Sequence, residues 1–300
     1  MPRGLALLLA HQPYWSTIMQ HILLPTDFSK NAWNAIAHVL ALLKTKKCTF
    51  YLLHVIPYTA YSGVDNSYNS NTTDLKNTLL EESRTQMKQL TAKIEGTPPA
   101  KNQTIIALTE CGHFVEVLKK VVEAHKIDLI GMGTKGATGL KKITVGSNTA
   151  DVITKIQIPL LAIPENANFA PPKEIVFPTD FHTGYEVTVL NTLLYFTALY
   201  KAQVRVLHIS KKGESLTAEQ LKNKEFLSDY LRHTDHSFHS LTGTDLEKAV
   251  QCFTESRDMD MIAMVAKNLN FFQRILFRPN VAEISYHTQF PFLVLHEGPL

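Results

Sequence analysis

Several glycines in the first half of the chain have a spacing that could hold a phosphate. The stretch GMGTKGATGLKKITVGSNTADV begins at Gly131, and its first six residues spell G-x-G-x-x-G, the pattern of dinucleotide-binding loops. The same residues also begin a P-loop, but Ala137 stands where that loop needs a lysine before the serine or threonine, here Thr138. Because glycine has no Cβ atom, backbone N–H groups can approach anionic oxygens closely. The stretch therefore predicts an anion site, of either the dinucleotide-binding or the P-loop type.

Neither pattern fits its surroundings. A dinucleotide-binding loop follows the first strand of its unit and runs directly into a helix, whereas this stretch follows the fourth predicted strand. Because Ala137 replaces the P-loop lysine, the positive charge that this motif brings to the phosphates is missing. What remains is Gly133, Gly136 and the pair Gly146 and Ser147. This pair opens a predicted helix, whose first N–H groups and dipole favour an anion.

The elements that must position this loop occur twice in the chain. HILLPTDFS begins at His21 and EIVFPTDFH begins at Glu174, and later strands repeat with nearly the same offset. An offset of a whole domain length indicates a tandem duplication. Strands with continuous apolar residues alternate with amphipathic helices, which predicts parallel sheets covered on both faces. We therefore predict an α/β protein with two doubly wound, five-stranded parallel sheets of Rossmann-like type.

The two copies of the repeat and the proline-containing segment between them define the expected domains. We predict domain 1 at residues 19–164, domain 2 at residues 174–300, and a linker at 165–173 that contains two consecutive prolines. Residues 1–18 are expected to form an N-terminal extension, with Met19 directly before the first strand. In the first copy, the expected strands cover residues 22–24, 50–56, 104–107, 128–132 and 158–164, and the later helices cover about 74–94, 113–126 and 147–155.

Asp27 follows the first predicted strand and is the candidate for recognising a sugar. In an open parallel sheet, ligands bind beyond the carboxyl ends of the strands, where the strand order reverses. A carboxylate there accepts hydrogen bonds from hydroxyl groups, so Asp27 and the glycine loop predict a site for a ribose followed by phosphates. The alternative is that Asp27 caps the following helix. His54 and His208 lie inside apolar strands and are expected to be structural.

The chain resembles the universal stress protein family. The residues that match are ILLPTDFS, LLHVIP, DLIGMGTKGATGLKKITVGS and PLLAIPE, and the likeness extends over residues 19–297, more weakly in the second copy. In that family, G-x2-G-x9-G-(S/T) marks the members that bind ATP. The resemblance implies an adenine nucleotide α-hydrolase-like fold. It also implies that the last strands pair edge to edge, here within one chain as an intramolecular pseudo-dimer, which leaves a further homodimer open.

The resemblance also implies an adenine-nucleotide site, with ATP, alone or with Mg²⁺, as the cofactor. Asp27 would contact the ribose and the backbone of Val55 the adenine, while the loop and the following helix would hold the phosphates. Lys135 departs from the histidine that is common at its position. The residues expected to bind the nucleotide are Pro25, Thr26, Asp27, Val55, Met132, Gly133, Lys135, Gly136, Gly146, Ser147 and Asn148.

The second copy lacks the phosphate half of this site. Aligned without a gap, the residues that replace Gly133, Gly136, Gly146 and Ser147 are Val265, Asn268, Arg278 and Pro279. Val265 adds a branched side chain where the backbone should approach the ligand, and Pro279 removes an N–H group at the start of the helix. We therefore expect one nucleotide site per chain.

Composition narrows the class of function. A net charge of +3 is too small to indicate nucleic acid or an anionic membrane as a partner. The three cysteines are isolated, which indicates a reducing compartment and a cytoplasmic protein. The histidines at 233, 236 and 239 lack the companions of a zinc site.

No catalytic residue can be assigned, because neither a positioned base nor a second carboxylate is identifiable near the loop. The expected function is an ATP-dependent regulatory protein of the stress response with an unidentified protein partner. The alternatives are a slow ATPase, and a non-nucleotide binder or scaffold that uses the second copy.

Overall fold

Strands and helices alternate along both halves of the chain. The computed structural model describes residues 19–62, 71–96, 102–134, 147–182, 185–243, 246–266 and 289–296. The N-terminal half contains β1 (His21–Pro25), α1 (Lys30–Leu42), β2 (Cys48–Pro57), α2 (Thr59–Ser62), α3 (Asn71–Glu95), β3 (Gln103–Gly112), α4 (Phe114–His125), β4 (Leu129–Gly133), α5 (Ser147–Lys155) and β5 (Leu160–Ile163). The C-terminal half contains β6 (Glu174–Thr179), α6 (Val187–Tyr200), β7 (Gln203–Ser210), α7 (Ala218–Tyr230), β8 (His236–Thr242), α8 (Leu246–Ser256), β9 (Met261–Val265) and β10 (Phe292–Leu295).

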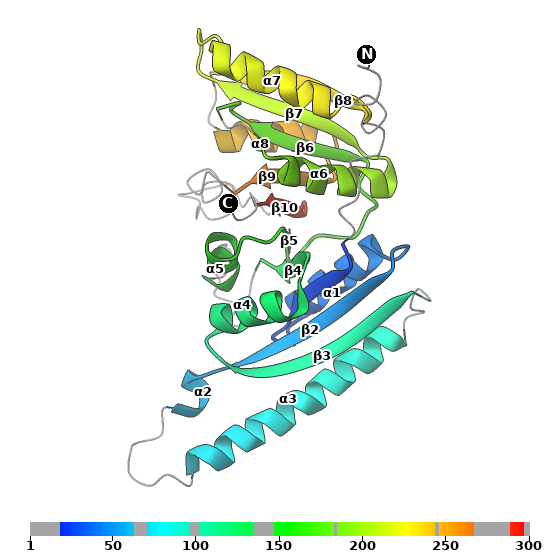
Figure 1. The fold of residues 1–300 in the computed structure, drawn as a ribbon, viewed down its shortest axis with the longest axis vertical. Coiled ribbons are helices and arrows are strands. Elements are labelled where there is room, and N and C mark those ends of the chain that lie inside the picture. The colour runs from blue at the N-terminus through cyan, green and yellow to red at the C-terminus, as the bar shows by residue number, and fades with distance from the viewer. Residues whose placement is uncertain are drawn as a thin grey trace, which may run out of the picture.

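The strands form one ten-stranded sheet that runs through both halves (Figure 1). Its order is β3-β2-β1-β4-β5-β10-β9-β6-β7-β8. Within each half the chain moves outward from the first strand, then crosses back to the other side, so each half is doubly wound as predicted. All neighbours are parallel except β5 and β10, which are antiparallel, with Leu161 opposite Leu293.

The pairing of β5 with β10 confirms the predicted intramolecular pseudo-dimer. It also changes one detail, because the two expected five-stranded sheets are continuous with each other. An unpaired last strand would expose N–H and C=O groups to other chains, and each half covers this edge of the other.

Helices cover both faces of the sheet, and both faces are packed across the seam between the halves. The cluster under α1, α3, α6 and α7 joins Leu161 of β5 to Leu293 and Leu295 of β10. The cluster under α4, α5 and α8 joins Leu160 and Ala162 to the same strand from the opposite side. Because every central strand is buried on both faces, its sequence is apolar throughout, as parallel strands require.

Polar contacts add to this connection between the halves. The hydroxyl of Tyr200, at the end of α6, donates to the carbonyl oxygen of Leu42 at the end of α1, at 2.9 Å. The side-chain amide of Asn34 on α1 donates to the carbonyl oxygens of Pro164 and Ala167, at 3.2 and 3.1 Å. The predicted linker, residues 165–173, forms neither helix nor strand. The hydrogen bonds from Asn34 hold the start of this linker against α1.

Two element boundaries differ from the sequence-based expectation. β3 is longer than predicted and pairs with β2 along its whole length, from Cys48 opposite Gln103 to Pro57 opposite Gly112. It lies at the edge of the sheet, so its polar residues tolerate exposure and hide the strand pattern. The short helix α2 lies between the expected strand at 50–56 and the expected helix at about 74–94, where no element was predicted. The predicted extension, residues 1–18, lies outside the described residues.

No helix in the described part of the chain is both long enough and apolar enough to cross a lipid bilayer.

Candidate functional site

The carboxyl ends of β1 and β4 form the point where the strand order of the N-terminal half reverses. β1 pairs with β2 on one side and with β4 on the other, with Leu23 opposite Ile130. Pro25 closes β1, and Gly133 closes β4. Ligands of open α/β sheets bind at this kind of crevice, and the topology brings the two predicted parts of the site to it.

The turn after β1 is fixed by hydrogen bonds from its own residues. The hydroxyl of Thr26 accepts from the N–H of Phe28, and Asp27 Oδ1 accepts from the N–H of Ser29, both at 3.0 Å. Phe28 has a φ of 61°, in the left-handed region that bulky residues rarely adopt, and these bonds hold it there.

Asp27 therefore stabilises the turn, while Ser29 is the helix cap, since its hydroxyl accepts from the N–H of Ala32 at 3.1 Å. The alternative that Asp27 caps the helix is therefore wrong, because Ser29 is the cap. The side chain of Asp27 is exposed at the crevice.

The neighbouring strand anchors the same turn. His54 Nδ1 on β2 lies 2.8 Å from the carbonyl oxygen of Thr26, and its ring lies 4.4 Å from the ring of Phe28. The expected structural role of His54 is therefore confirmed. Val55, the predicted adenine contact, follows His54 on β2 and is half-buried.

A buried threonine ties α5 to the end of β4. The hydroxyl of Thr149, in the first turn of α5, donates to the carbonyl oxygen of Gly133 at 2.9 Å. Thr149 is only 2% exposed, so this bond is made inside the protein. It holds the N-terminus of α5 beside the end of β4, the position that the phosphate hypothesis requires. Thr149 cannot be identified from the sequence, because a threonine in a first helical turn gives no signal of a partner on a distant strand.

The remaining predicted residues divide between described and undescribed positions. Met132 lies buried on β4, whereas Asn148 is exposed at the start of α5. Lys135, Gly136 and Gly146 lie outside the described residues, and of Ser147 only its place as the first residue of α5 is described.

Gly131 has a packing role. A Cβ atom at this position would lie 2.6 Å from Val39 Cγ2 on α1 and 3.0 Å from Leu24 Cδ2 on β1. Glycine is required so that α1 can pack closely against the sheet. The first glycine of the apparent dinucleotide pattern is therefore explained without a ligand, in agreement with the rejection of that pattern.

The C-terminal half repeats the turn after its first strand. The hydroxyl of Thr179 accepts from the N–H of Phe181, and Asp180 Oδ1 accepts from the N–H of His182, both at 3.0 Å. Phe181 has a φ of 58°, and His208 Nδ1 lies 3.0 Å from the carbonyl oxygen of Thr179. The Pro-Thr-Asp-Phe repeat is thus a structural motif that forms the same turn in both halves.

The C-terminal turn has additional contacts from α7. The side-chain amide of Gln220 donates to the carbonyl oxygen of Asp180, and that of Asn223 donates to the carbonyl oxygen of Phe181, both at 2.8 Å. Gln220 also completes the predicted capping box with Thr217. At the end of β9, half-buried Val265 replaces the Gly133 of the N-terminal half. These contacts hold the C-terminal turn against α7.

The described residues contain no group of three histidine, cysteine, aspartate or glutamate side chains arranged to hold a metal ion. Two of the histidines considered for zinc make separate local contacts. His236 Nδ1 lies 2.9 Å from the carbonyl oxygen of Thr234, and His239 Nε2 lies 2.7 Å from the hydroxyl of Ser237.

Comparison with known proteins places the chain in a family. A model of the universal stress protein family matches residues 19–164. Universal stress protein MJ0577 of Methanocaldococcus jannaschii is 31% identical over 161 residues, which cover 49% of this chain and 96% of the relative. The chain belongs to the universal stress protein family. A second universal stress protein of the same organism, MJ0531, is 26% identical over 148 residues, which cover 49% of this chain and 82% of the relative.

The family fold extends over both halves of the chain. The crystal structure of a universal stress protein from Archaeoglobus fulgidus covers 93% of this chain and 99% of its own, with a TM-score of 0.70. The sequence identity is 17%, so this likeness concerns the fold alone. The curated relatives match about half of the chain, whereas this neighbour matches nearly all of it. The duplication inferred from the repeated strands is consistent with this two-half layout of the family fold.

Proposed function

We propose that this universal stress protein binds ATP in the crevice between β1 and β4 of its N-terminal half. The observation that supports this most directly is the hydrogen bond from Thr149 to the carbonyl oxygen of Gly133, at 2.9 Å. It holds the N-terminus of α5 at the edge of the sheet where Asp27 lies exposed after the adjacent strand. Helix N-termini attract phosphate through their N–H groups and dipole, and neighbouring parallel strands are about 5 Å apart.

In this proposal the adenine lies against the backbone of Val55, and the ribose hydroxyls donate to Asp27. The phosphates lie on the loop of Gly133, Lys135 and Gly136 and on the helix start. Gly146, Ser147 and Asn148 are the residues proposed to hold the phosphates there.

We propose a regulatory role in which ATP occupancy sets the state of the protein, and slow hydrolysis is the second candidate. The proposed domains are residues 19–164 and 174–300. The C-terminal domain would act as a permanent structural partner without a nucleotide, because Val265 occupies the position of Gly133 and α7 holds the turn after β6. A regulatory protein partner would recognise the occupied N-terminal domain.

A pair of matched variants tests the proposal. Asp27→Asn keeps an oxygen to accept from Ser29 but replaces the other oxygen with a donor, so ATP should bind at least about tenfold more weakly. Asp180→Asn makes the same change in the C-terminal half and should leave ATP binding unchanged. Calorimetric titration with ATP, with and without Mg²⁺, and identification of nucleotide released on denaturation provide the measurements.

The proposal predicts one molecule of ATP per chain. It is wrong if the purified protein neither releases a nucleotide nor binds added ATP. Equal losses in the two variants would contradict the assignment of the site to the N-terminal half. Rapid ATP turnover by the unmodified protein would replace the binding role with an enzymatic one.

A further inference from the structure

A pocket lies between α3 and β3, at the outer edge of the N-terminal half. Its volume is about 470 Å³, within the range of sites that hold small molecules. β3 is the last strand of the sheet on this side, so the pocket opens at the edge of the molecule. It is distinct from the β1–β4 crevice, because none of the residues proposed to bind ATP contributes to its lining.

The pocket forms where one row of side chains on α3 faces Ala107, a small residue on β3. α3 buries Met87 and Ile94 against the sheet. The adjacent stripe, at helical spacing, consists of Arg84, Lys88, Thr91 and Glu95, and it forms one wall of the pocket. Ala107 and Thr109, two residues apart on β3, face the same side and form the opposite wall. Ala107 is too small to fill the space between them.

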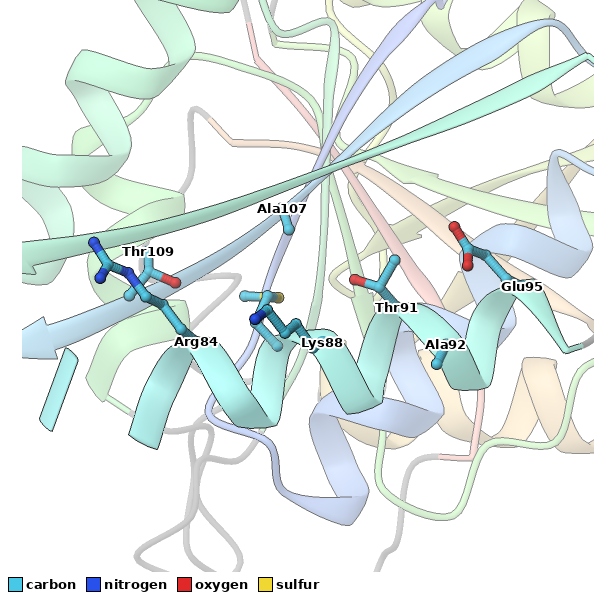
Figure 2. A pocket seen from close by; sticks show the side chains of 8 residues that line it. Arg84, Lys88, Thr91, Ala92, Glu95, Ala107 and Thr109 are labelled. Carbon is cyan, nitrogen blue, oxygen red and sulfur yellow. The ribbon is translucent and has the colours of Figure 1, made fainter. Parts of the chain in front are cut away.

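One polar atom in this wall has no partner. Thr91 Oγ1 is buried and makes no hydrogen bond to any residue that the structure describes. A buried hydroxyl without a partner destabilises a protein, so such a group is unusual. Figure 2 shows the hydroxyl oxygens of Thr91 and Thr109 pointing toward each other's side of the pocket. A ligand oxygen between them would satisfy Thr91.

The charges around the pocket are unequal. Figure 2 shows Arg84 near Thr109 at one end, Glu95 at the other end, and Lys88 between them. Arg84 lies 2.5 Å from Glu81, which offsets its charge. Lys88 is exposed and is in none of the ion pairs found among the described residues, so its ammonium group is available to a ligand. Glu95 disfavours a second anionic group at the far end.

We propose that this pocket binds a small organic monocarboxylate with an apolar body. The carboxylate accepts hydrogen bonds from Lys88, Thr91 and Thr109, which are three donors from facing walls. The apolar body lies against Met87 and Ala107. Glu95 and the apolar floor disfavour a dianion such as a phosphate ester. This site is independent of the proposed ATP site and does not require it.

Octanoate and 1-octanol, which share the apolar body, test the proposal on the full chain. Octanoate should bind saturably in a calorimetric titration, and 1-octanol should bind at least about tenfold more weakly because it lacks the carboxylate. Lys88→Gln should weaken octanoate binding by about tenfold, whereas Lys120→Gln on α4 should not change it. Ala107→Leu should abolish octanoate binding by filling the pocket, while ATP binding stays as in the unmodified protein.

Thr91→Val separates a ligand contact from a structural role. The variant should bind octanoate more weakly, yet its Tm should be unchanged or raised, because an unsatisfied hydroxyl has been removed. Thr85→Val on the same helix is the control and should leave octanoate binding unchanged. A lowered Tm for Thr91→Val, no saturable octanoate binding, or undiminished binding by Ala107→Leu would each overturn the proposal.

Discussion

The Nδ1 atom of His54 lies 2.8 Å from the carbonyl oxygen of Thr26, and His208 repeats this relationship with Thr179 at 3.0 Å. In each half, a histidine on the second strand anchors the turn that follows the first strand. Both halves have therefore kept the turn after the first strand and the histidine that anchors it, although the glycine sequence is present in one half only.

His54→Leu should affect both stability and ligand binding. The loss of one partly buried hydrogen bond should lower the free energy of unfolding by about 1 kcal/mol. The turn that presents Asp27 would also lose its anchor, so ATP affinity should fall by about fivefold or more. Urea denaturation and calorimetric titration measure the two effects.

His208→Leu is the matched control for this prediction. It should lower the free energy of unfolding by a similar amount and leave ATP affinity unchanged. Unaltered ATP affinity in His54→Leu would mean that the turn after β1 does not belong to the site.

Gly131→Ala should be destabilising even though the change adds only a methyl group. That methyl would lie 2.6 Å from Val39 Cγ2, and such overpacking costs about 1–3 kcal/mol. The double variant with Val39→Ala should recover much of the loss, as thermal unfolding of the four proteins of the cycle can measure. ATP binding should persist in the folded variant. Loss of ATP binding without loss of stability would instead assign Gly131 to the ligand.

Two buried histidines predict a loss of stability in mild acid. Burial lowers the pKa of His38 and that of His296 from 6.5 to about 4. Between these values the unfolded chain binds more protons than the folded one, so the free energy of unfolding falls as pH falls from 6.5 toward 4. The slope is up to about 1.4 kcal/mol per pH unit for each histidine, and the loss levels off below pH 4.

His38→Leu should reduce that slope, because it removes one of the two groups whose pKa is lowered by burial. The ring of His38 packs edge-on against Phe169, and its Nδ1 atom is buried without a hydrogen-bond partner among the described residues. Urea denaturation at pH 7, 6 and 5 is the measurement. His233→Gln, an exposed position, should leave the slope as it is. An unchanged slope in His38→Leu would show that this histidine is protonated equally in both states.

A fragment of residues 19–164 should self-associate. Removing the C-terminal half uncovers β5, whose backbone otherwise pairs with β10, and exposes apolar residues at the seam. Sedimentation velocity should therefore detect dimers that dissociate on dilution. A fragment that is folded and monomeric at high concentration would contradict the importance of this edge.

Much of the fold could be predicted because the informative residues are local. The repeated Pro-Thr-Asp-Phe motif and the apolar strands define two doubly wound halves, and the matching last strands indicate how the halves meet. β3 was underestimated because an edge strand needs fewer apolar residues. The role of Gly131 depends on its contact with Val39, and that of Thr149 on its contact with Gly133. Such tertiary contacts leave no pattern in the sequence.

The candidate site was predictable only in part for the same reason. Asp27 was identified by its place after a strand, and its bond to Ser29 was not foreseen. The positions assigned to Lys135, Gly136 and Gly146 rest on family spacing and stay predictions.

The antiparallel pairing of β5 with β10 decides where the carboxyl ends of the strands lie in each half. Because the strands of the two halves run in opposite senses, their carboxyl ends emerge on opposite rims of the continuous sheet. A symmetric dimer of identical chains would present the same crevice on both rims. In this chain the residues at the two rims differ, so the molecule has two distinct rims where a symmetric dimer would have two identical ones.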